Sequence, residues 1–187
     1  MLTGIEDTRV RMKAMGTSLD HVMIVGGDEG DWEAMTPARW DDLIDELGRG
    51  VAEAGGRWLT MRPYGAPSGG PGTRWTREVG HDLVAIVDST ADGRVAFASA
   101  VARIPGGGEV DEKRVAEALY EPAVGEPDLI VILGPADHLP PSLVWELAYG
   151  ELVYSARPFE SLDRALLDEA LRAFARRDRR FGGLSPS

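Results

Sequence analysis

Three carboxylates fall within four positions of one another, directly after a short apolar run. Asp28, Glu29 and Asp31 follow the run HVMIV at 21–25 and the glycine pair at 26–27. Hard divalent cations prefer oxygen ligands, and ligands of α/β proteins bind at the carboxyl ends of strands. The pattern therefore fits a magnesium site, and it equally fits a solvated loop on an acidic surface.

Other reactive side chains are scarce in this chain. It contains no cysteine, which excludes a disulfide, a thiolate metal site and a cysteine nucleophile. Its histidines, His21, His81 and His138, have neither the spacing of a metal site nor the neighbours of a catalytic triad. We find no nucleophile motif.

Composition and charge exclude several classes of protein. The 187 residues are 43% hydrophobic and 27% charged, which is typical of a globular domain and not of a disordered chain. The formal net charge of −11 argues against nucleic acid as a partner, because binding phosphates needs a basic surface. No apolar run approaches the roughly 20 residues of a membrane span. We expect one cytoplasmic domain over 1–187, with residues 1–20 as a flexible N-terminal segment.

The elements that must position these residues predict an α/β fold. The continuous apolar run at 21–25 predicts a strand that is covered on both faces. A helix should follow from the cap Thr36 and Pro37 to the glycines at 55–56, and a second strand at 58–61. Strand, crossover helix and strand together indicate a mostly parallel sheet flanked by helices.

The rest of the chain continues this alternation. We predict a loop at 63–72, strands at 83–87, 129–133 and 152–154, and helices at 94–104, 111–120, 142–149 and from the cap Ser161 onward. The last helix ends in a cluster of arginines, which suits the negative end of a helix dipole. Its members are Arg172, Arg176, Arg177, Arg179 and Arg180.

The C-terminal half resembles the cis-prenyltransferases, the family of undecaprenyl diphosphate synthase. The family pattern P-D-L-x-I, then L-L-W-Q-L-A-Y-x-E, then R-x-R-R-F-G-G, is matched in order by residues 127–131, 143–151 and 177–183. A weaker likeness links residues 21–32 to the family's H-V-x-x-I-M-D-G-N-x-R-W. The resemblance implies a trimmed cis-prenyltransferase fold.

The first of the family's two diphosphate sites is altered in this chain. By the resemblance, the motif's aspartate, which organises magnesium, falls on Gly27, its asparagine on Glu29 and its arginine on Asp31. Glycine offers the metal no ligand atom, and a carboxylate repels the diphosphate that an arginine would bind. The chain is also shorter between Pro63 and Asp82, where the family places helices that wall its product tunnel.

The second diphosphate site is altered as well. The family's two arginines that hold isopentenyl diphosphate fall on Ile132 and His138, and its serine falls on Pro140. An isoleucine cannot replace a guanidinium group. Only Glu151 matches, at the position of the glutamate that joins the magnesium shell. The resemblance therefore predicts no magnesium bound by this chain alone.

One functional motif of the family is complete. Arg180, Phe181 and Gly182 match the C-terminal R-x-G, which in dimeric members reaches the isopentenyl diphosphate bound in the other subunit. Loss of the local sites with retention of this motif predicts a non-catalytic auxiliary subunit. Its partner in a heterodimer would be a catalytic cis-prenyltransferase chain that holds Mg²⁺. We expect the dimer face to include the last strand and the helices after 142 and 161.

Two alternatives remain open at this stage. The chain could be a diverged magnesium-dependent isoprenoid diphosphate enzyme that uses Asp28, Glu29 and Asp31, with Glu151. It could also be a purely interacting or regulatory module. In the favoured interpretation the chain is cytoplasmic, and peripheral to the membrane only through its complex.

Overall fold

The structure is a computed structural model that describes residues 18–65, 72–105 and 110–176. Its centre is a six-stranded sheet in the order β3-β4-β2-β1-β5-β6. The strands are β1 (His21–Val25), β2 (Trp58–Arg62), β3 (Arg74–Val79), β4 (Leu83–Asp88), β5 (Leu129–Leu133) and β6 (Glu151–Ser155). All neighbours are parallel except β3 and β4, which are antiparallel. This confirms the predicted α/β class and the five predicted strands.

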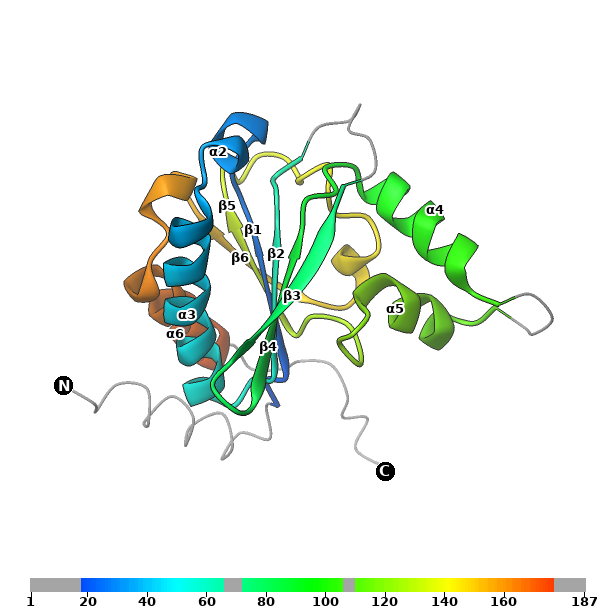
Figure 1. The fold of residues 1–187 in the computed structure, drawn as a ribbon, viewed down its shortest axis with the longest axis horizontal. Helices are drawn as coiled ribbons and strands as arrows, with labels where there is room; N and C mark the ends of the chain where they lie inside the picture. Colours follow the sequence, from blue (N-terminus) through cyan, green and yellow to red (C-terminus); the bar gives the residue numbers. More distant parts are fainter. Residues whose placement is uncertain (1–17, 66–71, 106–109, 177–187) are drawn as a thin grey trace, which may run out of the picture.

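Helices cover both faces of the sheet (Figure 1). They are α2 (Glu29–Glu33), α3 (Pro37–Ala54), α4 (Gly93–Arg103), α5 (Glu112–Tyr120) and α6 (Arg164–Arg176). One apolar core packs α3 and α6 against the sheet, and a second packs α4 and α5 against the other face. Every residue of β1 and β5 is buried, because these central strands are covered on both sides.

Local signals set the helix ends. Thr36 Oγ1 accepts a hydrogen bond from Arg39 N at 3.3 Å, Pro37 occupies the first turn, and Gly55 ends α3 with φ +104°. The cap of α6 differs from the prediction. Asp163 Oδ1 accepts a hydrogen bond from Leu166 N at 2.8 Å, whereas Ser161 Oγ donates to Pro158 O. Asp163 therefore caps α6, and Ser161 belongs to the short 3₁₀ turn before it.

The predicted helix at 142–149 is wrong. Only a 3₁₀ turn forms there, at Glu146–Ala148. Tertiary contacts hold the segment in another shape: Ser142 Oγ donates to Tyr64 O at 3.0 Å, and Glu146 Oε2 accepts a hydrogen bond from Val144 N at 3.0 Å. The apolar spacing that suggested a helix instead places Leu143 in the core and leaves Val144 exposed.

A buried ion network joins this segment to the sheet. Arg62, at the end of β2, donates from Nη1 to Glu146 Oε1 at 2.6 Å and from Nη2 to Asp88 Oδ2 at 3.3 Å. All three side chains are almost completely buried. Arg74 of β3 reaches the same Asp88 oxygen at 2.6 Å. Burial alone would raise the pKa of Asp88, but the two guanidinium groups outweigh it and lower this pKa to about 2.

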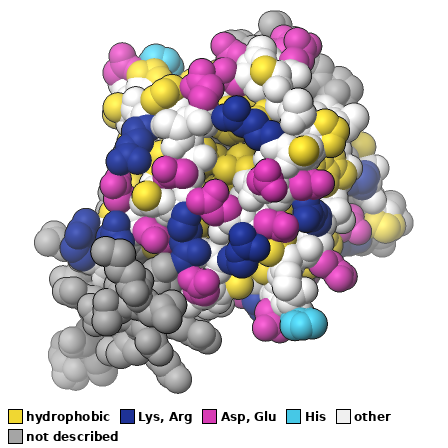
Figure 2. Space-filling model, turned by 60° about the vertical axis from the view of Figure 1, so that its left-hand side comes forward, with side chains coloured by type: hydrophobic (Ala, Val, Ile, Leu, Met, Phe, Trp, Pro, Cys, Tyr) yellow, Lys and Arg dark blue, Asp and Glu magenta, His cyan; other side chains and the backbone are white. Residues whose placement is uncertain are grey.

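Charged side chains on the α3 and α6 face alternate in sign (Figure 2). Arg77 of β3 pairs with Asp41 and Asp45 of α3, and Arg164 of α6 pairs with Glu53 and Asp168. Because the cations are interspersed with carboxylates, the described residues of this face form no continuous basic stripe (Figure 2). Within the described ranges, no helix combines the length and the apolar character that crossing a bilayer requires.

Removing the central guanidinium should strongly destabilise the protein. Arg62→Ala leaves the carboxylates of Asp88 and Glu146 buried without their shared cation, and we expect the free energy of unfolding to fall by about 3–5 kcal/mol. The exposed pair Arg57–Asp20 provides the control, since Arg57→Ala should cost about 1 kcal/mol or less. Urea unfolding measures both. Equal losses in the two variants would contradict the assigned role of Arg62.

Candidate functional site

The loops after β1, β2 and β5 meet at the carboxyl edge of the sheet, where α/β proteins bind ligands. Gly26 N donates to Arg62 O at 3.0 Å, and Tyr64 N donates to Gly27 O at 2.9 Å. These bonds extend the pairing of β1 and β2 past their ends. The two hydrogen bonds fix Gly26 and Gly27, the glycine loop, which by sequence matching corresponds to the first diphosphate site.

Aromatic side chains of this same chain pack onto that loop. A Cβ added to Gly27 would lie 2.9 Å from two ring carbons of Phe159 and 3.0 Å from the Trp32 ring. Trp32 Nε1 also donates to Gly26 O at 2.9 Å. Gly27 has φ +76°, a conformation that glycine adopts without strain. The space above the loop therefore holds Phe159, which is 7% exposed, and Trp32.

The three carboxylates after the loop do not converge. Asp28 Oδ1 accepts a hydrogen bond from Asp31 N, and Asp31 Oδ2 accepts one from Asp28 N, each at 2.9 Å. This is a capping box that begins α2. Glu29 lies in the first turn of α2. No group of three metal-ligating side chains occurs in the part of the chain that the structure describes. The donor set here therefore does not fit a magnesium ion.

Glu151 lies at the amino ends of the parallel strands, whereas the acidic loop lies at their carboxyl ends. It begins β6 and pairs with Leu129, which pairs in turn with Val22 near the start of β1. Asp28 follows the end of β1, at least roughly 10 Å further along the strand direction. The structure thus does not bring Glu151 together with Asp28, Glu29 and Asp31 within one chain.

The second diphosphate site has no arginine at the two positions where the family has one. Ile132 is fully buried in the core, Pro140 is buried, and His138 is exposed beside Asp137, with 2.6 Å between Nδ1 and Oδ1. Tyr64 lies over the end of β5, since a Cβ added to Gly134 would lie 2.6 Å from the Tyr64 ring. Arg180, Phe181 and Gly182 lie outside the described residues.

His21 has a structural environment. Its Nε2 lies 2.8 Å from Thr60 Oγ1, its Nδ1 lies 3.1 Å from Gly125 O, and the side chain is buried. Burial lowers the pKa of His21 to about 4, so the imidazole is neutral near pH 7. The side chain bridges β1, β2 and the turn before β5.

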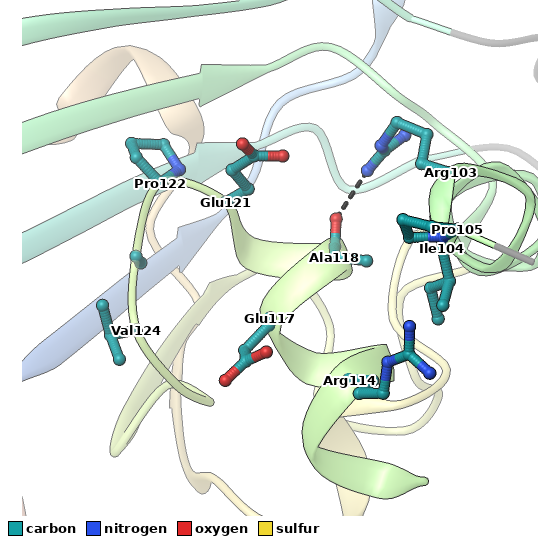
Figure 3. Close-up of a pocket in the computed structure, with 10 residues that line it drawn as sticks. Arg103, Ile104, Pro105, Arg114, Glu117, Ala118, Glu121, Pro122 and Val124 are labelled. Carbon is teal, nitrogen blue, oxygen red and sulfur yellow. Dashed lines mark hydrogen bonds between the residues drawn. The ribbon is translucent and has the colours of Figure 1, made fainter. Parts of the chain in front are cut away.

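Two cavities of the described structure lie away from the glycine loop. One, of about 480 Å³, lies between the carboxyl end of α4 on one side and α5 with the turn that follows it on the other (Figure 3). Across it, Arg103 Nη2 donates to Ala118 O at 2.5 Å. A second, of about 510 Å³, lies between β3 and α4 and includes Arg74, Asp88 and Arg103. Both mix apolar walls with charges of the two signs, unlike an apolar tunnel for a growing hydrocarbon chain.

Comparison with known proteins identifies the family. The model of the family described as putative undecaprenyl diphosphate synthase matches residues 77–182, which is more than half of the chain. The chain belongs to this family, the cis-prenyltransferases. An isoprenyl transferase from Bifidobacterium longum is 27% identical over 153 residues, which cover 82% of this chain and 52% of that protein. Isoprenyl transferase 2 from Bradyrhizobium diazoefficiens is 39% identical over 75 residues, 40% of this chain and 30% of the relative.

A solved structure shares the fold. The crystal structure of a probable undecaprenyl diphosphate synthase from Campylobacter jejuni superposes with a TM-score of 0.61 at 16% identity, and covers 89% of this chain and 99% of that one. The match confirms the predicted cis-prenyltransferase fold. The chain spans about half the length, or less, of the curated relatives quoted above.

Sequence reasoning missed the side chains that fill the carboxyl edge. Phe159 and Tyr64 were not singled out, since each is an ordinary apolar or aromatic residue in a loop. The glycines at 26, 27 and 134 were the available signal, because they mark places where another group comes close to the backbone. Arg62 could have been noticed as a lone cation at the end of a buried strand.

The environment of His21 predicts a pH-dependent stability. Between about pH 6.5 and pH 4 the unfolded chain binds a proton at this imidazole and the folded chain does not. The free energy of unfolding should therefore fall as the pH falls through this range, by up to about 3 kcal/mol from this group. His21→Gln should remove this contribution to the slope, and His81→Gln, at an exposed position, should not. Urea unfolding at a series of pH values tests this; identical slopes in parent and His21→Gln would refute it.

Proposed function

We propose that this chain is the non-catalytic auxiliary subunit of a heterodimeric cis-prenyltransferase, which condenses isopentenyl diphosphate with an allylic diphosphate. The observation that carries the proposal is the packing of Phe159 and Trp32 onto Gly26 and Gly27. In the family this loop cradles a diphosphate. Here the chain's own aromatic rings take up the space against the backbone.

Electrostatics at the loop supports the same function. The charged side chains that follow the glycines are Asp28, Glu29 and Asp31, and all are carboxylates. Two like charges 4 Å apart repel by about 1 kcal/mol in water and about 4 kcal/mol near a protein surface. A diphosphate placed here would meet repulsion, and Asp28 and Asp31 already serve as each other's capping partners.

Residues 177–187, which we call the C-terminal arm, follow α6 in sequence and carry the R-x-G motif that matches the family. The helix α6 packs through Leu166, Leu167 and Phe174 into the core shared with α3. Arg164 also ties α6 to α3 through its ion pair with Glu53. A firmly anchored helix suits an arm that must deliver Arg180, Phe181 and Gly182 to a site in another subunit. Mg²⁺ would belong to that partner's site.

An apolar surface is available for the partner. Leu139, Val144 and Tyr149 are large apolar side chains that are roughly half exposed, and they lie on the segment that Arg62 and Glu146 hold in place. Trp145 between them stacks on Phe97 of α4 with 5.6 Å between ring centroids. We take the exposed apolar side chains of this one segment as the interaction surface for the partner. This surface replaces the predicted helix in the expected dimer face.

Assays of each chain alone and together test the proposal. The purified chain alone should show no prenyl transfer with or without Mg²⁺, and a full-length cis-prenyltransferase from the same source should co-purify with it and be more active in the complex. Magnesium-dependent turnover by the isolated chain, lost in Asp28→Ala, would instead establish a diverged enzyme. Stable binding without any kinetic effect would establish a purely interacting module.

The arginine of the C-terminal arm should act on catalysis in the complex. One charge-assisted contact to phosphate contributes about 1.5–3 kcal/mol, so Arg180→Ala should lower kcat/KM of the complex by roughly ten- to a hundredfold. Arg176→Ala is the matched control, because Arg176 is an exposed arginine in the last turn of α6. Both variants should still bind the partner. Unchanged kinetics in Arg180→Ala would remove the arm from the mechanism.

A further inference from the structure

Among the described strands, β3 and β6 are the two edge strands of the sheet. The strand order places β3 at the end of the sheet, where it pairs with β4 alone among the described strands. In Figure 1, β3 runs along the front of the sheet, with α3 and α6 to one side and α4 and α5 to the other. An edge strand presents a row of unpaired backbone N–H and C=O groups, and such a row is a template for a further strand.

The chain holds β3 firmly from within. Arg74 donates to Asp88, Arg77 pairs with Asp41 and Asp45 of α3, and Val79 packs against Gly48, where an added Cβ would lie 3.0 Å from it. The outer positions remain open. Thr76 and Glu78 are exposed, and Trp75 is 38% exposed. The six-residue strand contains no proline, and its three charged side chains, Arg74, Arg77 and Glu78, are of both signs.

The side chains of β3 complement a second copy of β3 in one register. In a continuous sheet formed by two antiparallel copies, residues directly opposite each other share a face. A two-fold axis at Thr76 sets Thr76 against Thr76 of the second copy and Arg74 against Glu78 of the second copy. It also sets Trp75 against Arg77 of the second copy. Each heterotypic pair occurs twice, once on either side of the axis.

All of these contacts are favourable. Opposite charges, a threonine pair and an arginine over an indole each stabilise cross-strand neighbours. Shifting the axis by one residue loses this match. An axis at Arg77 sets two arginines against each other, and an axis at Trp75 leaves Glu78 without an opposite residue in the strand. Charge complementarity therefore selects the register centred on Thr76.

We propose that β3 is a homophilic docking edge, through which two copies of this chain pair antiparallel and join their sheets into one. The occupant is a second copy of the same chain because the strand is complementary to itself. This edge lies at the opposite end of the sheet from β6. The proposal is therefore independent of the auxiliary-subunit function, and either can fail without the other.

A single introduced thiol tests the register directly, because the natural chain has no cysteine. Directly opposite residues of antiparallel strands have Cα atoms about 4.5–5.5 Å apart, within the range of a disulfide. Thr76→Cys should give a covalent dimer under mild oxidation. Glu78→Cys is the matched control: the two thiols would lie about 13 Å apart along the strands and should not cross-link. Equal cross-linking of both variants, or none in Thr76→Cys, would overturn the proposal.

Charge complementation tests the same contact without a covalent bond. Thr76→Lys and Thr76→Glu each place like charges opposite each other across the axis. Each should raise the dimer dissociation constant at least about tenfold in sedimentation velocity. An equimolar mixture of the two should restore the dimer through lysine–glutamate pairs, and Thr76→Val should leave it intact. A monomeric parent at the highest soluble concentration, or a mixture no tighter than its components, would contradict the proposal.

The outcome can be separated from that of the heterodimer assay. Thr76 lies in β3, at the other end of the strand order from β6. Thr76→Lys should therefore leave the kinetics of the reconstituted complex unchanged. Thermal unfolding of each variant should match that of the parent under dilute, monomeric conditions, because Thr76 is exposed. Loss of complex activity in Thr76→Lys would show that β3 contacts the catalytic partner and not a second copy.

Discussion

The buried guanidinium group of Arg62 is the constraint on which the arrangement of the carboxyl edge depends. It lies at the end of β2 and binds Glu146, Asp88 and the carbonyl oxygen of Ser142. A fully buried cation requires carboxylates around it, since burying an unpaired charge is very costly. The segment after Pro141 must therefore come back to the sheet, and contact with Arg62 holds it in a shape other than the predicted helix.

Because the segment after Pro141 packs back onto the sheet, side chains of the same chain cover the carboxyl ends of the strands. With the segment from Ser142 onward held against Arg62 and Tyr64, the hydroxyl and the backbone amide of Ser142 both donate to the Tyr64 carbonyl oxygen. Tyr64 is thereby held over Gly134, while Phe159 covers Gly27 from the other side. Gly27 and Gly134 therefore contact aromatic carbon, and aromatic carbon offers a diphosphate no hydrogen bond.

Sequence patterns predicted the elements that depend on local signals. Residues 21–25 and 129–133 formed buried strands, and Thr36, Pro37 and Gly55 set the bounds of α3. The strand β3 was missed because its alternation of charged residues with Trp75 and Val79 resembles a loop, and because the hairpin at Gly80 is recognisable only when its partner strand is known. The segment at 142–149 was assigned as a helix because spacing alone cannot show that Glu146 points inward to Arg62.

The site was predictable only in part for a similar reason. Matching letters located Gly27, Asp31, Ile132 and Glu151, but the pairing of Asp28 with Asp31, and the distance of both from Glu151, depend on the folded backbone. Three nearby carboxylates in a sequence look like a metal site whether their oxygens converge or turn back to their own amides. Here the capping box decides between these possibilities, because a carboxylate that accepts backbone N–H bonds at a helix start points along the helix.

The buried charges near the carboxyl edge balance one another. Arg62 and Arg74 are balanced by Asp88 and Glu146, so the buried cluster has no net positive charge to attract a phosphate. A family member that binds diphosphate at this edge needs cations whose donors face the ligand. In this chain the guanidinium groups of Arg62 and Arg74 face inward to carboxylates of the same chain, where they stabilise the fold. A single substitution at Gly27 or Asp31 would not reverse that arrangement.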